Sequence, residues 1–116
     1  MAANPVPVQP RTLEIDFQIP QDGTPTLICR GRITTETSGL FKSEVKKLIP
    51  QSKLIVVDLS KVDYIDSSGL GTVLATYVSA KTSGCTLKLV NLNQRIKELL
   101  QLTRLASVFE GYGEYL

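Results

Sequence analysis

The chain has 116 residues, of which 42% are hydrophobic and 21% are charged, a composition that predicts a soluble protein with one hydrophobic core. Its 13 lysine and arginine residues against 11 acidic residues leave a net charge of +2, which gives no support to nucleic-acid binding. Because it contains no histidine, it lacks the usual general base, the Ser-His and Cys-His nucleophile pairs and the commonest metal ligand. We therefore expect neither catalytic activity nor a bound cofactor.

The ends of the chain and its cysteines indicate a cytoplasmic protein. No apolar run approaches the roughly 18 to 20 residues that a membrane-spanning helix needs, and the N-terminus does not resemble a secretory signal. The prolines of the first ten residues predict that residues 1–11 form a flexible tail before one domain at residues 12–116. Cys29 and Cys85 lie in separate strand-like runs without CxxC spacing, so we expect buried thiols in a reducing compartment.

The first part of the sequence predicts a β-hairpin. Apolar and polar residues alternate over residues 13–19, which is typical of a half-buried strand. Residues 20–23, Pro-Gln-Asp-Gly, favour a turn, because glycine adopts a positive φ and aspartate hydrogen-bonds its own backbone. Residues 24–30 return as a second strand, expected to be antiparallel to the first, and Gly31 closes it.

A helix and a buried strand follow the hairpin. The helix is predicted to begin near Thr34 or Thr35, to bury an apolar stripe within residues 41–49 and to stop at Pro50. Residues 53–59 are a nearly continuous apolar run of strand length, which is the pattern of a strand buried on both faces.

A second helix is predicted from about residue 67 to residue 83, with Gly84 as its C-terminal cap. Its apolar stripe comprises Leu70, Val73, Leu74, Tyr77 and Val78. Residues 85–89 alternate as a fourth strand, and Asn91 or Asn93 caps a third helix. Residues 106–109 are predicted to add an edge strand. The remaining apolar side chains near this end could line a partner groove, but we expect them to be buried, namely Leu102, Leu105 and Val108.

This order of elements predicts an α/β fold built on a small mixed β-sheet. The N-terminal hairpin supplies antiparallel strands, whereas the central strands are parallel because helices join them through right-handed crossovers. The helices then pack on the sheet.

The hexapeptide Asp66-Ser67-Ser68-Gly69-Leu70-Gly71 lies between the buried strand and the second helix. The two serine hydroxyls are therefore expected at a helix N-terminus, where free backbone N–H groups and the helix dipole favour a phosphate. The two glycines leave the first turn without side chains, so that a partner's backbone could approach. Serine is also a preferred N-cap, so local chemistry leaves Ser67 as a simple cap, a phosphate acceptor or both.

Three aspartates surround this turn: Asp58, predicted at a strand end, Asp63, predicted in a turn, and Asp66. A metal site needs more convergent ligands than these, and such aspartates commonly bond their own backbone. Asp66 could instead orient the Ser67 hydroxyl or contact a basic group of a partner. A nucleophilic Ser67 would need an activating base, and the sequence does not supply one.

Residues 57–71, Val-Asp-Leu-Ser-Lys-Val-Asp-Tyr-Ile-Asp-Ser-Ser-Gly-Leu-Gly, resemble the signature of STAS domains, and most closely that of bacterial anti-sigma factor antagonists. The resemblance extends more weakly from about residue 13 to about residue 109. It implies a small mixed sheet with helices packed on it. It also implies that a partner anti-sigma factor, a serine kinase, phosphorylates Ser67, with Ser68 as the less favoured acceptor. Thr34 stands where family members often carry an aspartate in a Gly-x-Leu-Asp turn.

The same resemblance implies a partner-binding surface on two loops. Its residues are Asp66, Ser67, Ser68, Gly69, Leu70, Gly71, Arg32, Thr34 and Thr35. The unphosphorylated chain would bind the anti-sigma factor and release a sigma factor, and phosphorylation of Ser67 would end the binding. The kinase would supply ATP and magnesium, and a serine phosphatase could reset the switch. The chain would act as a monomer, without nucleic acid or membrane insertion. The alternative is a non-switching docking module of a stress-signalling or lipid-transport assembly.

Overall fold

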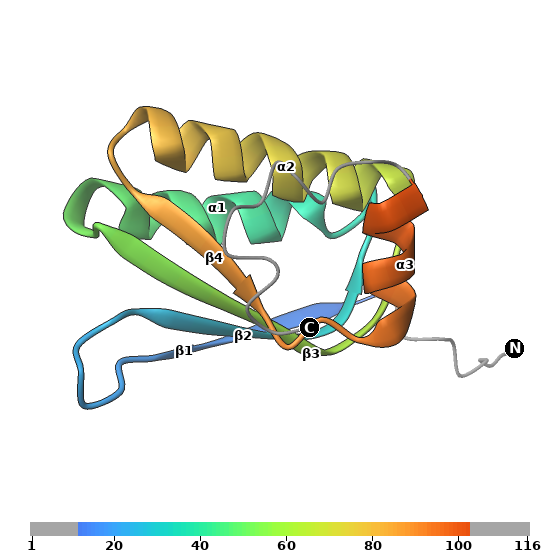
Figure 1. Cartoon of the computed structure of the whole chain (residues 1–116), viewed down its shortest axis with the longest axis horizontal. Helices are drawn as coiled ribbons and strands as arrows, with labels where there is room; N and C mark the ends of the chain where they lie inside the picture. The colour runs from blue at the N-terminus through green and yellow to red at the C-terminus, as the bar shows by residue number, and fades with distance from the viewer. Residues whose placement is uncertain (1–11, 103–116) are drawn as a thin grey trace, which may run out of the picture.

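The computed structural model describes residues 12–102, which form a four-stranded sheet with two long helices on one face (Figure 1). The strands lie in the order β1-β2-β3-β4 across the sheet. In chain order the elements are β1 (Leu13–Gln18), β2 (Thr26–Ile33), α1 (Ser38–Leu48), the 3-10 helix η1 (Ile49–Gln51), β3 (Leu54–Ile65), α2 (Ser67–Thr82), β4 (Thr86–Val90) and α3 (Gln94–Leu102).

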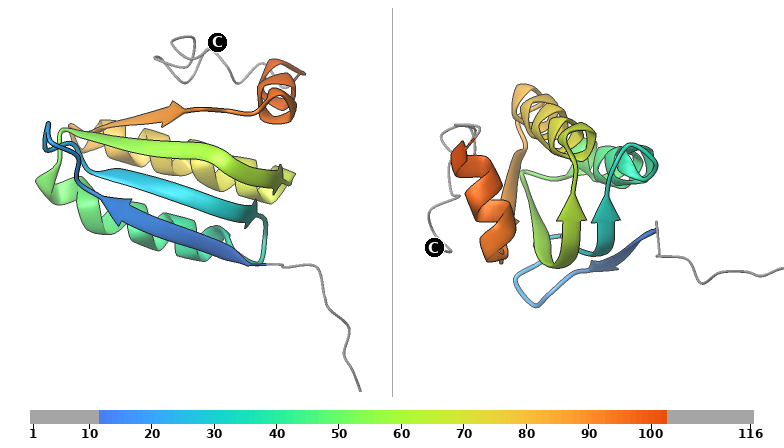
Figure 2. Two further views of the ribbon diagram at one scale, coloured as in Figure 1. Left: turned by 90° about the horizontal axis from the view of Figure 1, so that it is seen from below. Right: turned by 90° about the vertical axis from the view of Figure 1, so that its right-hand side faces the viewer.

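The sheet is mixed, which confirms the fold class predicted from the sequence. β1 pairs antiparallel with β2, whereas β2 with β3 and β3 with β4 pair in parallel. α1 connects β2 to β3, α2 connects β3 to β4, and both helices cover the same face of the sheet (Figure 2). Because β2 and β3 are parallel, their carboxyl ends meet at one edge, and the amino ends of α1 and α2 lie together there.

The core lies between the sheet and these two helices. Phe41 and Val45 of α1 are fully buried, and the buried side of α2 is centred on Val73, Tyr77 and Ala80. The strands contribute most of the other fully buried side chains, among them Leu27, Ile33, Ile55, Val57, Leu59, Val62 and Leu87, and α3 adds Leu100. Burial of each such side chain contributes about 1.5–3 kcal/mol to folding, so this layer holds the helices in fixed positions over the sheet.

Both cysteines are buried and unpaired, as predicted. Burial, with a smaller contribution from the negative charge of Asp58, raises the pKa of Cys29 to about 12. Burial also raises the pKa of Cys85. Both groups therefore remain thiols at neutral pH and act as small apolar side chains of the core.

Two strands are longer than the sequence predicts. β2 continues past Gly31 to Ile33, and β3 continues past residue 59 to Ile65. The pairing of β2 with β3 shifts register twice along this extension, so the outer part of β3 loses the simple alternation that marks a strand in sequence. Asp58 and Asp63 therefore lie within β3, and their predicted positions at a strand end and in a turn are wrong.

α1 begins at Ser38, with Thr37 at the N-cap position, and not near Thr34 or Thr35 as predicted. The Thr37 hydroxyl donates to the Arg32 carbonyl oxygen at 2.7 Å and accepts from the Thr34 backbone N–H at 2.9 Å. These bonds hold residues 34–37 as a separate turn before the helix. This turn carries part of the predicted partner surface.

Other local predictions differ in outcome. Gly84 has a φ of 82° directly after α2, as expected of a C-terminal cap, and the Asn93 side chain accepts from the Ile96 backbone N–H at 2.9 Å. Val78 is half exposed and Leu102 is 82% exposed, so the predicted burial of both is wrong. The tail at residues 1–11, the edge strand at residues 106–109, Leu105 and Val108 lie outside the described residues.

Candidate functional site

Asp66 is the N-cap of α2, and it stands directly between β3 and the two serines. Its Oδ1 accepts a hydrogen bond from the Gly69 backbone N–H at 2.7 Å, and its carbonyl oxygen accepts from the Leu70 N–H at 2.9 Å. Asp66 thus accepts a hydrogen bond from a backbone N–H group that has no partner within the first turn of the helix, as an N-cap residue does. Ser67 is the first helical residue, so its possible role as the cap, left open by the sequence, is taken by Asp66.

Asp66 also joins the Ser67 turn to the loop between β2 and α1. Its Oδ2 accepts from the Thr35 backbone N–H at 3.3 Å, and its own N–H donates to the Ile33 carbonyl oxygen at 3.2 Å. Arg32, Thr34 and Thr35, which the sequence assigns to the same surface as Ser67, are therefore held beside it. One carboxylate braces both loops.

The two glycines of the turn have different roles. A Cβ atom at Gly69 would collide with the Ile33 carbonyl oxygen, and Gly69 is buried. The absence of a side chain there allows the close approach of this chain's own β2, and the prediction that Gly69 leaves room for a partner's backbone is wrong. Gly71 is exposed and faces open space, as that prediction requires.

Ser67 and Ser68 are both exposed in the first turn of α2. Within residues 12–102, neither hydroxyl is engaged in a hydrogen bond. The N–H groups at this helix end and the helix dipole favour an anion bound to either hydroxyl. The geometry therefore permits a phosphate on either serine.

A hollow of about 340 Å³ includes Asp66 in its lining. Its other lining residues are Arg32, Thr34, Thr35, Glu36 and Tyr64. The Arg32 guanidinium stacks over the Tyr64 ring, 4.5 Å from the ring centroid, and its buried Nε has no hydrogen-bond partner in the described chain. Tyr64 is a site residue that sequence reasoning missed. Its register partner in β2 is Arg32, but the register shifts hide that pairing from the sequence.

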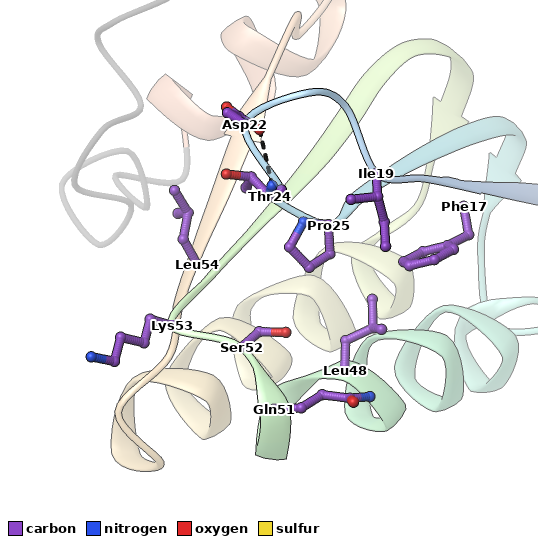
Figure 3. Close-up of a pocket in the computed structure, with 11 residues that line it drawn as sticks. Phe17, Ile19, Asp22, Thr24, Pro25, Leu48, Gln51, Ser52, Lys53 and Leu54 are labelled. Carbon is purple, nitrogen blue, oxygen red and sulfur yellow. Dashed lines mark hydrogen bonds between the residues drawn. The ribbon is translucent and has the colours of Figure 1, made fainter.

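A larger hollow, of about 430 Å³, lies at the opposite end of the sheet, between the hairpin turn and the start of β3 (Figure 3). Its apolar lining includes Phe17, Ile19 and Leu48. The Asp22 carboxylate accepts a hydrogen bond within the hairpin turn, from the Thr24 backbone N–H at 2.9 Å. None of the predicted site residues lies there.

Residues 12–102 hold no group of three or more His, Cys, Asp and Glu side chains placed to bind a metal ion. Asp58 accepts hydrogen bonds from Asn91 Nδ2 at 3.0 Å and from the Ser60 backbone N–H at 2.8 Å. No helix among these residues has the length and apolar character needed to cross a membrane.

Comparison with known proteins identifies the family. The family model of the STAS domain matches residues 17–114. The anti-sigma-B factor antagonist of Bacillus subtilis (strain 168) is 30% identical over 80 residues, which are 69% of this chain and 73% of that protein.

Solved structures agree with this assignment. An anti-sigma factor antagonist from Mycobacterium paratuberculosis superposes with a TM-score of 0.74 at 23% identity, over 86% of this chain and 85% of that chain. The anti-sigma factor antagonist SpoIIAA in its unphosphorylated form superposes with a TM-score of 0.61 at 17% identity, over 76% of this chain and 82% of that chain. The phosphorylated form of SpoIIAA from Bacillus superposes with a TM-score of 0.62 at 16% identity, over 78% of this chain and 83% of that chain. The chain therefore belongs to the STAS domain family, and its relatives include anti-sigma factor antagonists.

Proposed function

We propose that this protein is an anti-sigma factor antagonist switched by phosphorylation of Ser67. Unphosphorylated, it binds an anti-sigma factor that is also a serine kinase, and the sigma factor held by that kinase is released. The observation that carries the proposal is the double bracing by Asp66, which brings the Ser67 turn and the loop at residues 32–35 into one exposed surface. The proposed contact residues are Asp66, Ser67, Ser68, Gly71, Arg32, Thr34 and Thr35. Leu70, which the sequence assigns to the same surface, is buried in the core.

The relatives support this proposal. The Bacillus subtilis relative is named as an antagonist of an anti-sigma factor, and SpoIIAA has been solved with and without its phosphate. Release of a sigma factor to RNA polymerase is a cytoplasmic event, so we place the protein in the cytoplasm. It acts as a monomer that exchanges between the kinase and a phosphatase.

The switch follows from charge. The kinase transfers the γ-phosphoryl group of ATP to Ser67 Oγ, the hydroxyl loses its proton, and ADP leaves. The phosphate adds about −1.5 to −2 charges next to Asp66. In a packed interface this charge is desolvated and repelled, whereas the helix N-terminus stabilises it in the free protein. Binding is therefore lost while the fold is retained, without a large conformational change.

Substitutions of Ser67 test the proposal. Ser67→Ala should fold, resist phosphorylation and bind the anti-sigma factor as the wild type does. Ser67→Asp should fold but bind about 100- to 1,000-fold more weakly, which corresponds to a loss of roughly 3–4 kcal/mol. Affinities are measured by isothermal titration calorimetry with the purified anti-sigma factor kinase encoded nearest to this gene.

Ser68→Ala is the matched control for the acceptor, because Ser68 is also exposed and lies one residue away. If Ser67→Ala and Ser67→Asp bind equally well, the charge mechanism is wrong and a non-switching docking role is favoured. If Ser68→Ala prevents phosphorylation and Ser67→Ala does not, the acceptor has been misassigned.

A further inference from the structure

A groove of about 310 Å³ runs between α1 and α2, starting beside the Ser67 turn. Its residues are Lys42, Lys46, Ser68, Gly71, Thr72, Ala75, Thr76 and Ser79. The two helices lie side by side on the same face of the sheet (Figure 1). Residues of both helices line the groove. Because it includes Ser68 and Gly71, the groove is continuous with the surface proposed to bind the anti-sigma factor.

The charge of the groove has one sign. Lys42 and Lys46 are exposed, one helical turn apart on α1, and none of the residues that line the groove is acidic. Within residues 12–102, neither lysine makes a hydrogen bond or an ion pair, whereas Lys47 on the same helix pairs with Glu44 at 3.0 Å. At the Ser68 end of the groove the amino end of α2 adds the positive end of its helix dipole, whereas Lys46 lies in the last turn of α1.

The α2 side of the groove is shallow because its side chains are small. Ser68, Thr72, Ala75 and Ser79 succeed one another at helical spacing, and Gly71 has open space where a side chain would be. The residues from Ser68 to Ser79 span about 16 Å of helix. Another backbone can therefore come close to α2 while its side chains reach the lysines on α1.

We infer that this groove receives an acidic segment of the anti-sigma factor, whose carboxylates pair with Lys42 and Lys46. The inference rests on the proposed function and adds the chemistry of the partner. The inference also explains how phosphorylation would end binding. A phosphate on Ser67 would lie next to Ser68, where the acidic segment enters the groove, and would repel the carboxylates of that segment. The lysine pair would then set affinity and association rate, and Ser67 would set the switch.

Charge substitutions in the groove test this inference. Lys42→Glu/Lys46→Glu should weaken binding of the anti-sigma factor kinase by about 10- to 100-fold, and Lys42→Gln/Lys46→Gln should weaken it less. The wild type should lose affinity steeply as sodium chloride increases, and the glutamate variant should lose most of that salt dependence. Binding is measured by isothermal titration calorimetry, and circular dichroism checks that each variant is folded.

The matched control is Lys53→Glu/Lys61→Glu, which makes the same change in net charge at two exposed lysines that do not line the groove. Its affinity should stay within about threefold of the wild type, since distant exposed charges are screened. If the groove variant binds no more weakly than this control while Ser67→Asp still binds at least 100-fold more weakly than the wild type, the inference is overturned and the proposed function stands. If the unmodified wild type does not bind the kinase, the proposed function itself is overturned.

Discussion

The two ends of the sheet are built in different ways. At the hairpin end, Asp22 bonds Thr24 two residues along the chain, and the Gly23 N–H closes a turn on the Pro20 carbonyl. At the Ser67 end, Asp66 bonds Thr35, which is 31 residues away in sequence, as well as its own helix. The hairpin turn is fixed by local chemistry, whereas the candidate site exists only while two distant loops are held together. Substitutions at the Ser67 end should therefore cost more than matched substitutions elsewhere.

The largest effect is expected from Gly69→Ala, because the added methyl group would meet the Ile33 carbonyl oxygen and push the two loops apart. We expect a loss of about 2–3 kcal/mol in the free energy of unfolding, measured by urea denaturation. Gly71→Ala, two residues further along the same helix, adds its methyl group in open space. It should leave the stability unchanged or raise it by up to about 1 kcal/mol. Equal effects of the two substitutions would show that the Gly69 contact does not constrain the loops.

Removal of the brace should have the next largest effect. Asp66→Ala loses the helix cap and the bond to Thr35, and we expect it to cost about 1–2 kcal/mol of folding free energy. Asp22→Ala loses a single exposed bond in the hairpin turn, and we expect it to cost about 0.5 kcal/mol or less. Chemical denaturation of both variants makes the comparison. If Asp22→Ala is as costly as Asp66→Ala, the proposed difference between the two ends of the sheet is wrong.

The smallest expected effect is a pH-dependent change in folding stability caused by Cys29. This residue lies in the core that both ends of the sheet share. Its pKa is about 12 in the folded protein, against 9.0 for a free thiol, so the folded state keeps a proton that the unfolded state loses first. The resulting stabilisation is fully present below pH 9 and is lost as the pH rises towards 12. Between pH 8 and pH 10 it should decrease by about 1 kcal/mol.

Urea denaturation of the wild type and of Cys29→Ala across this pH range isolates the contribution of the thiol. The difference in stability between the two proteins should shrink as the pH rises. A constant difference would mean that the Cys29 thiol is not desolvated in the folded protein.

What could be read from the sequence follows the same division between local and long-range structure. The turn at Gly23, the cap at Gly84 and the burial of the cysteines were predictable, because each depends on local chemistry or on apolar pattern. The length of β3 was not predictable, because the register shifts against β2 break the alternation of apolar and polar residues in its outer half. The start of α1 is an exception to this division, because the Thr37 hydroxyl bonds that hold a separate turn before the helix are local.

The candidate site shows why a motif gives only part of a surface. The sequence of the Ser67 turn identified the acceptor and its neighbours, but it could not show that Gly69 packs against this chain's own Ile33. The stacking of Arg32 on Tyr64 joins two strands, and so does not appear as any local pattern. Residues whose role depends on another element were the ones misassigned or missed.

The most direct test of the switch begins by incubating the chain with ATP, magnesium and the anti-sigma factor kinase encoded nearest to this gene. Intact-protein mass spectrometry with fragmentation then locates any added phosphate, and calorimetry measures how tightly the modified chain binds the same kinase. The account predicts one added phosphate, located on Ser67, and binding at least 100-fold weaker than that of the unmodified chain. A chain that binds the kinase but gains no phosphate, or that binds equally well after phosphorylation of Ser67, would contradict it.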